Sequence, residues 1–209
     1  MNSIVEEVMT PAEALLKLKE GNFRFVNNLM VNKDLLNMVE STKDGQKPFA
    51  AILSCMDSRT SSELVFDQGV GDVFSVRIAG NIVSDGILGS LEYATAVVGS
   101  KLILVMGHTN CGAIKGACDN VELGYVTSVL QQIQPAIAQE QTITHDRTSH
   151  NPEFVHKVTL LNVKHSINQI LQRSGIIRNL VAEGKVGIVP AIYDVATGKV
   201  IFNDLGPVA

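Results

Sequence analysis

Short, continuous apolar runs alternate with amphipathic segments through the first half of the chain. The runs at 49–53, 72–79 and 101–107 are too short for buried helices and fit strands that are buried on both faces. Between them, SSELVFDQ and SDGILGSLEYATAVVG carry apolar residues at helical spacing. This alternation of strand and helix predicts a parallel sheet with right-handed crossovers.

Helix signals precede these strands and follow them. Thr10, Pro11 and Glu13 have the pattern of a capping box with proline at the first helical position, so a helix should begin there. A long helical region is expected from about 124 to 140. A further helix should begin at Asn151-Pro152 and run to about residue 173.

The last segment with a clear pattern is KVGIVPAIYDVATGKVIFND, at 185–204. It predicts two strands around a turn at Thr197-Gly198. Pro190 has no backbone N–H to give to a neighbouring strand, which indicates an edge strand.

We therefore expect an α/β fold with a central parallel sheet of about four strands flanked by helices. A C-terminal edge strand or hairpin and an N-terminal helical arm over about 1–40 should complete it. A chain of 209 residues with 45% hydrophobic residues can bury roughly 70% of its unfolded surface, so residues 1–209 should form a single domain.

Charge and hydropathy exclude several classes of partner. A formal charge of −4 and the lack of a Lys/Arg stripe argue against a nucleic-acid partner. No apolar run reaches the ~20 residues of a membrane span, and the N-terminus carries two acidic residues where a signal peptide has basic ones. We expect no membrane partner and a cytoplasmic location.

The chain has three cysteines, Cys55, Cys111 and Cys118. An odd number of cysteines in a chain long enough to have its own core points to reduced thiols rather than to a disulfide framework. Metal binding or catalysis then becomes the expected use of at least some of them.

Two of these thiols lie near the carboxyl ends of predicted strands, where parallel sheets have their functional sites. Cys55 follows the strand at 49–53, His108 follows the strand at 101–107, and Cys111 comes three residues later. The carboxyl ends of the strands should bring all three together. Two thiolates and one imidazole suit Zn²⁺, and three protein ligands leave a position for water or substrate, as in a catalytic zinc site.

Each of these residues also has a simpler explanation. A cysteine at a strand end is often a small buried hydrophobe, Asp57 and Ser58 could cap a helix, and Arg59 could form a surface ion pair. A single His-x-x-Cys is a weak signal. The combination of Cys-x-Asp-x-Arg after one strand and His-x-x-Cys after another favours the metal site.

The segments CMDSRT, FDQGVGDVFSVRIAGN, LEYA and GHTNCGAIKG resemble the motifs of the β-class carbonic anhydrases, in that family's order and spacing, from about 45 to 116. The resemblance implies reversible hydration of CO₂ to bicarbonate and a proton by a zinc-bound hydroxide, with zinc held by Cys55, His108 and Cys111. It also implies a homodimer or a dimer of dimers with the active site at the subunit interface.

The same resemblance implies that Asp57 and Arg59 are catalytic. Asp57 would accept a hydrogen bond from the zinc hydroxide, and Arg59 would keep Asp57 ionised and in place. Alternate residues of an extended segment share a side, so Cys55, Asp57 and Arg59 can form a line of ligand, orienter and anchor. The alternative, in which Asp57 is a fourth zinc ligand that displaces water, stays open.

The resemblance also implies a substrate pocket formed by Gln46, Phe74, Tyr93 and Gly112, with the two aromatic residues often supplied by the neighbouring subunit. One branch of the family has an inhibitory bicarbonate site that uses a tryptophan three residues before the first zinc cysteine. That position is Ile52 here, which together with Gln46 favours the plant-type branch without such inhibition.

Two other functions remain open on this scaffold. One is hydrolysis of a CO₂ analogue such as carbon disulfide. The other is a non-catalytic zinc or thiol module that mediates assembly. A structural zinc would need a fourth protein ligand, for which Asp57 is the candidate, and a redox module would need a Cys-x-x-Cys pair, which the chain lacks.

Overall fold

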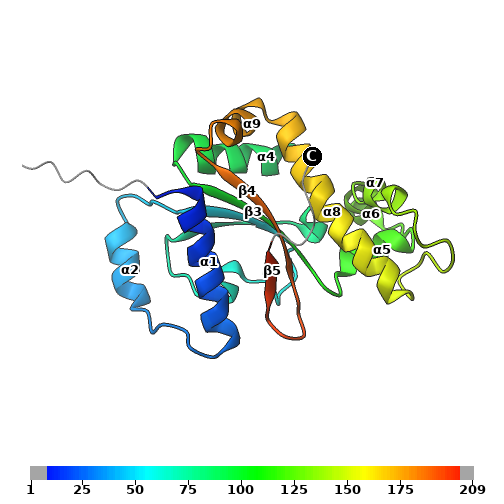
Figure 1. Cartoon of the computed structure of the whole chain (residues 1–209), viewed down its shortest axis with the longest axis horizontal. Coiled ribbons are helices and arrows are strands. Elements are labelled where there is room, and N and C mark those ends of the chain that lie inside the picture. The colour runs from blue at the N-terminus through cyan, green and yellow to red at the C-terminus, as the bar shows by residue number, and fades with distance from the viewer. Residues whose placement is uncertain (1–8, 203–209) are drawn as a thin grey trace, which may run out of the picture.

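A five-stranded sheet forms the centre of residues 9–202, the part of the chain that this computed structural model describes (Figure 1). The strands lie in the order β2-β1-β3-β4-β5, with β1 to β4 parallel and β5 antiparallel to β4. Their bounds are Ala50–Ser54 (β1), Val73–Arg77 (β2), Leu102–His108 (β3), Gly187–Tyr193 (β4) and Val200–Phe202 (β5). The predicted α/β fold with a parallel sheet and a C-terminal hairpin is confirmed.

Helices cover both faces of the sheet and its carboxyl end (Figure 1). The first begins as expected, because Thr10 Oγ1 accepts from Glu13 N while the Glu13 carboxylate accepts from Thr10 N. The helices are Pro11–Val26 (α1), Leu35–Thr42 (α2), Ser62–Val65 (α3), Asp85–Glu92 (α4), Gly112–Cys118 (α5), Gly124–Gln131 (α6), Gln134–Gln139 (α7), Pro152–Arg173 (α8) and Gly175–Ala182 (α9). A 3₁₀ turn at Ala79–Asn81 follows β2, and a π-helical turn at Tyr93–Val97 extends α4.

Successive residues of the central strands point to opposite faces of the sheet. In β1, Ala50 and Ile52 pack with Leu18 of α1, whereas Ala51 and Leu53 pack in the cluster built with α4, α8 and α9. Both faces are therefore apolar and covered, which explains why β1 and β3 are continuous hydrophobic runs.

The predicted helical region from 124 to 140 is confirmed, and it consists of two helices. It is divided into α6 and α7, with Pro135 in the first turn of α7. Proline has no N–H for a bond to the preceding turn. The chain therefore starts a new helix, in which the missing N–H costs nothing.

The expectation that Pro190 marks an edge strand was wrong. Pro190 lies in β4, between β3 and β5, opposite Val105 of β3. Among the described residues, the edge strand β5 pairs with 191–193 of β4. No residue within 9–202 lies opposite Pro190 on the β5 side, so the missing N–H leaves no described carbonyl of that side without its donor.

Parts of two expectations lie outside the described residues. These are residues 1–8 of the predicted arm and residues 203–204 of the predicted second strand. Within the described part, the arm consists of α1, a loop and the unpredicted helix α2. No helix between residues 9 and 202 has both the length and the apolar character needed to cross a membrane.

Asp67 ties this arm to the rest of the molecule. Its side chain is fully buried, forms ion pairs with Arg24 of α1 and Lys33 of the following loop, and accepts from Val31 N. Burial raises the pKa of Asp67, but the bonds from Lys33 and Arg24 lower it more, so the pKa lies below its ordinary value of 3.8. The carboxylate is ionised in the folded protein at neutral pH.

We expect Asp67→Asn to lower the free energy of unfolding at pH 7 by about 1–3 kcal/mol, because an amide cannot satisfy two cations. A lowered pKa in the folded state gives stability that is present above the ordinary pKa and lost as the pH falls through the folded pKa. The difference between the two proteins in urea unfolding should therefore shrink below about pH 3.8. Equal differences at pH 7 and pH 3 would contradict this. Glu40→Gln, which breaks the exposed Lys43 pair, should cost less than about 0.5 kcal/mol.

Candidate metal centre

The carboxyl ends of β1 and β3 bring Cys55, His108 and Cys111 together. Cys55 follows β1, His108 is the last residue of β3, and Cys111 caps the start of α5. Their ligand atoms all lie within 4.8 Å of one another, and the three residues are only 5%, 1% and 1% exposed. Among residues 9–202, these three form the one group of at least three histidine, cysteine or acidic side chains that is spaced closely enough to hold a metal ion.

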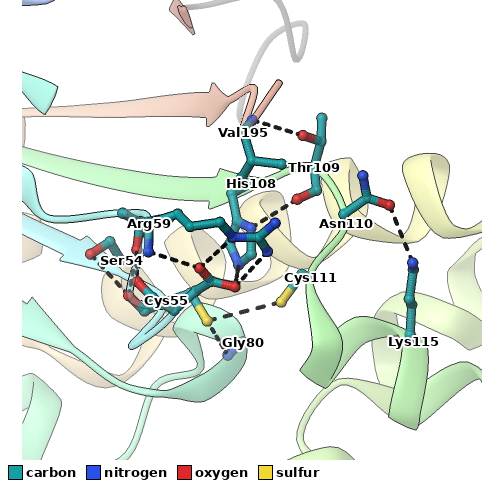
Figure 2. Close-up of polar contacts among 12 residues, drawn as sticks. Ser54, Cys55, Arg59, Gly80, His108, Thr109, Asn110, Cys111, Lys115 and Val195 are labelled. Atoms are coloured by element: carbon teal, nitrogen blue, oxygen red, sulfur yellow. Dashed lines mark hydrogen bonds and ion pairs between the residues drawn. The ribbon is translucent and has the colours of Figure 1, made fainter. Parts of the chain in front are cut away.

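The hydrogen bonds of His108 leave one ring nitrogen available. Nδ1 lies 2.9 Å from the carbonyl oxygen of Thr109, so it carries the proton and donates it there (Figure 2). Nε2 is buried and has no hydrogen-bond partner among the described residues. A histidine whose Nδ1–H is held by a carbonyl presents Nε2 as a neutral ligand, which is the usual arrangement at a metal.

The two thiols also fit one ion. Cys55 Sγ and Cys111 Sγ lie 4.0 Å apart, far beyond a disulfide and close to the ~3.8 Å between two thiolates on a tetrahedral zinc. The hydrogen bond from Cys111 lowers the pKa of the Cys55 thiol, helped by His108 and by the N–H of Gly80. The same contact, together with burial, raises the pKa of Cys111.

Asp57 and Arg59 form a closed pair beside this group. Arg59 donates from Nε to Asp57 Oδ1 at 2.9 Å and from Nη2 to Oδ2 at 2.7 Å, and its backbone N–H also donates to Oδ1. Asp57 Oδ2 lies 4.0 Å from His108 Nε2. The Arg59 guanidinium holds the pKa of Asp57 well below its ordinary range, so the carboxylate stays ionised at neutral pH.

Two residues that hold the 55–57 segment were not assigned to the site from the sequence. Arg77, the last residue of β2, donates to the carbonyl oxygens of Cys55 and Asp57. The buried hydroxyl of Thr60 lies 2.9 Å from the same two oxygens. Arg77 and Thr60 therefore fix the backbone on both sides of Met56.

The expected pocket residues do not meet at the metal group within one chain, apart from Gly112, which directly follows Cys111. Gln46 is exposed and precedes β1, whereas Cys55 follows it, so the two lie at opposite ends of a strand that spans roughly 16 Å. Phe74 and Tyr93 contact each other edge to face on the outer side of β2.

Phe74 and Tyr93 line an open hollow of about 640 Å³ between β2 and α4. Tyr93 is 52% exposed and Val97 is 71% exposed, so apolar surface is present on this side of the molecule. Gly86 and Gly89 form the neighbouring surface of α4, where an added Cβ would meet no atom within 4 Å.

Comparison with known proteins gives consistent matches along most of the chain. The family model described as carbonic anhydrase matches residues 50–200. Carbonic anhydrase 2 of Mycobacterium tuberculosis is 34% identical in an alignment of 200 residues that covers 93% of this chain and 93% of that protein. The carbonic anhydrase of Mycolicibacterium smegmatis is 34% identical over 196 residues, or 91% and 92% of the two chains.

Solved structures agree with these matches. A tetrameric β-carbonic anhydrase of the fungus Sordaria macrospora superimposes with a TM-score of 0.71 at 26% identity, over 81% of this chain and 87% of that one. The Coccomyxa β-carbonic anhydrase in complex with acetazolamide gives 0.72 at 26% identity, over 88% and 83%.

Proposed function

The chain belongs to the β class of the carbonic anhydrase family, and we propose that Cys55, His108 and Cys111 hold its zinc ion. It is a zinc-dependent lyase that hydrates CO₂ reversibly to bicarbonate and a proton. The observation that carries the assignment of ligands is the buried, unpartnered Nε2 of His108 beside two thiols at metal-binding distance.

The donor set matches the ion. When bound, Zn²⁺ lowers the pKa of a water ligand and so supplies a nucleophile for the carbon of CO₂ at neutral pH. Cys55 and Cys111 would bind as thiolates and release their protons as the metal enters. His108 would bind as the neutral imidazole that the Thr109 carbonyl already selects.

Asp57 is assigned to orient the nucleophile. Its carboxylate lies beside the Nε2 of His108 and, being ionised, can only accept a hydrogen bond, so it would fix which lone pair of the nucleophile faces CO₂. Arg59 engages both carboxylate oxygens, which favours this role over the alternative of a fourth metal ligand.

Metal removal tests the proposal. Dialysis against a zinc chelator should abolish CO₂ hydration, and one equivalent of Zn²⁺ per chain should restore it. The two thiols should react with a thiol reagent faster in the zinc-free protein, because no metal then holds their lone pairs. A zinc-free protein that keeps its full rate would overturn the assignment.

We also propose that the active unit is a homodimer or a dimer of dimers, formed through the face of β2 and α4. Phe74 and Tyr93 lie on this face, away from the metal group of their own chain, and apolar surface is exposed beside them. A second copy could bring these residues and Gln46 to its partner's metal. The tetrameric state given for the Sordaria macrospora enzymes supports assembly.

Gly89→Glu should separate the subunits. A Cβ at this position has open space within 4 Å, and glutamate favours helix more than glycine does, so folding of one chain should not suffer. In sedimentation, the wild type should have at least twice the 22.5 kDa mass of one chain, and the variant should shift toward that mass with at least about a tenfold loss of kcat/KM. Gln131→Glu, on the exposed side of α6, is the control. A variant that keeps wild-type mass and rate would exclude this face.

We assign the chain to the plant-type branch, without an inhibitory bicarbonate site. Ile52 is fully buried in β1 among apolar neighbours, where the other branch has tryptophan. We expect added bicarbonate to slow CO₂ hydration only as a simple product inhibitor. A sigmoidal loss of rate with bicarbonate concentration in stopped-flow assays would contradict the assignment.

The thiols of the site also suggest a cellular location. All three cysteines are unpaired and buried, and Cys55 and Cys111 can hold zinc only while they stay reduced. We infer a reducing compartment, the cytoplasm.

A further inference from the structure

We infer that Asn162 of α8 is a positioning residue for the metal centre, which it serves by holding Gly80 so that the Gly80 N–H stays on the sulfur of Cys55. The inference rests on the proposed zinc site. The side chain of Asn162 donates to the Gly80 carbonyl oxygen rather than to any of the three ligands, so its effect would pass through the 3₁₀ turn at Ala79–Asn81.

This turn has a backbone that needs support from outside. Gly80 has φ 68° and ψ 17°, and Asn81 has φ 44°, so two successive residues lie in the left-handed region. Asparagine adopts this region at a cost, and glycine is free to leave it. A Cβ on Gly80 would lie 2.8 Å from Ile133 Cδ1 and 3.3 Å from Ala113 Cβ, so only glycine fits the position.

Two side chains of α8 provide that support. Asn162 Nδ2 donates to the Gly80 carbonyl oxygen at 2.8 Å, and Ser166 Oγ donates to the Asn81 carbonyl oxygen at 2.9 Å. They are four residues apart, on one face of the helix, and both are only 1% exposed. The helix therefore holds two carbonyls of the turn, those of Gly80 and Asn81, each with a separate buried donor.

The two held residues differ in the acceptor that their own backbone N–H reaches. The Gly80 N–H donates to Cys55 Sγ at 3.4 Å (Figure 2). The Asn81 N–H instead donates to the Ile78 carbonyl oxygen. Asn162 thus fixes a glycine whose amide reaches a metal ligand, whereas Ser166 fixes a residue whose amide does not.

A hydrogen bond from an N–H group to the sulfur of a metal ligand draws electron density from the thiolate and fixes the orientation of the cysteine side chain. Groups that hold metal ligands in this way commonly change metal affinity by about 10–100-fold when they are removed. Asn162 also keeps a buried Oδ1 without a hydrogen-bond partner among residues 9–202. An apolar residue would avoid the free-energy cost of burying an oxygen without a partner. The amide at position 162 therefore does more than fill space in the core.

The test compares Asn162→Leu, a similar shape without a donor, with Ser166→Ala, which removes the neighbouring bond from the same turn. Zinc affinity is measured by competition with a chromophoric chelator, and the thiolate-to-metal charge-transfer band is recorded on the Co²⁺-substituted protein. We expect Asn162→Leu to weaken zinc binding about tenfold and to shift the band. Ser166→Ala should stay within about twofold of the wild type, with an unshifted band.

Asn162→Ala is measured in parallel in case the leucine does not pack, and circular dichroism reports the fold of each variant. Folded Asn162 variants with wild-type zinc affinity and an unshifted band would overturn the inference. Equal changes in Ser166→Ala would also overturn it, since general loosening of the turn would then explain both. A wild type that binds no zinc in this titration would instead remove the proposed zinc site.

Discussion

Replacing Cys55 with serine should empty the metal centre, from about one zinc per chain to below roughly one tenth, with CO₂ hydration reduced to background. The serine hydroxyl does not ionise near neutral pH and is a poor ligand for zinc. The buried pair of sulfurs, 4.0 Å apart, would lose one member, and His108 and Cys111 alone would bind the ion weakly. Metal analysis after gel filtration, together with stopped-flow CO₂ hydration, gives both quantities on one sample.

Cys118→Ala provides the matched control. Cys118 is also buried and packs in the same apolar cluster, but it is not one of the three residues with metal-binding spacing. Its replacement should leave zinc content and turnover unchanged while it costs some stability through the lost sulfur. Loss of zinc from Cys118→Ala, or full zinc in Cys55→Ser, would contradict the ligand set.

The second large effect is expected from Asp57→Asn, which should keep zinc and lose about 10²–10³-fold in kcat. In the wild type, the Arg59 guanidinium donates to both carboxylate oxygens of Asp57. The amide of the variant has nearly the same shape, but its NH₂ group would face these donors and cannot accept from them. The side chain would turn or lose its anchor, and it could no longer serve as a fixed acceptor for the nucleophile. Zinc content is measured alongside the rate, because the account requires the two to separate.

Asp146→Asn is the control for this change. Asp146 is exposed in the loop before α8, and asparagine tolerates its positive φ of 45° equally well. It should have wild-type zinc content and rate. If Asp57→Asn lost its zinc, the aspartate would be holding the metal rather than orienting the nucleophile, and if it kept its rate, the orienting role would be wrong.

The grouping of Cys55, His108 and Cys111 could be predicted because its signals are local in the sequence. Cys55 and His108 each follow a continuous apolar run, and parallel strands must end at the same edge of a sheet. The sheet was predictable for the same reason. The error at Pro190 arose because the proline was taken as the mark of an edge strand, whereas β4 lies between β3 and β5.

The residues that hold the site were harder to find, because their contacts join segments far apart in the chain. Arg77 reaches the Cys55 carbonyl across 22 positions and Asn162 reaches Gly80 across 82. A signal for Asn162 does exist in the sequence. It lies with Thr159 and Ser166 on the otherwise apolar, buried face of α8, and polar residues on such a face need partners.

Stopped-flow CO₂ hydration by zinc-replete protein, followed from about pH 7 to about pH 9, tests whether the metal centre supplies the nucleophile. We expect a rate that is proportional to zinc content and rises with pH, because the nucleophile forms by loss of a proton at the metal centre. A protein with one zinc per chain and no CO₂ hydration at any pH in this range would contradict it.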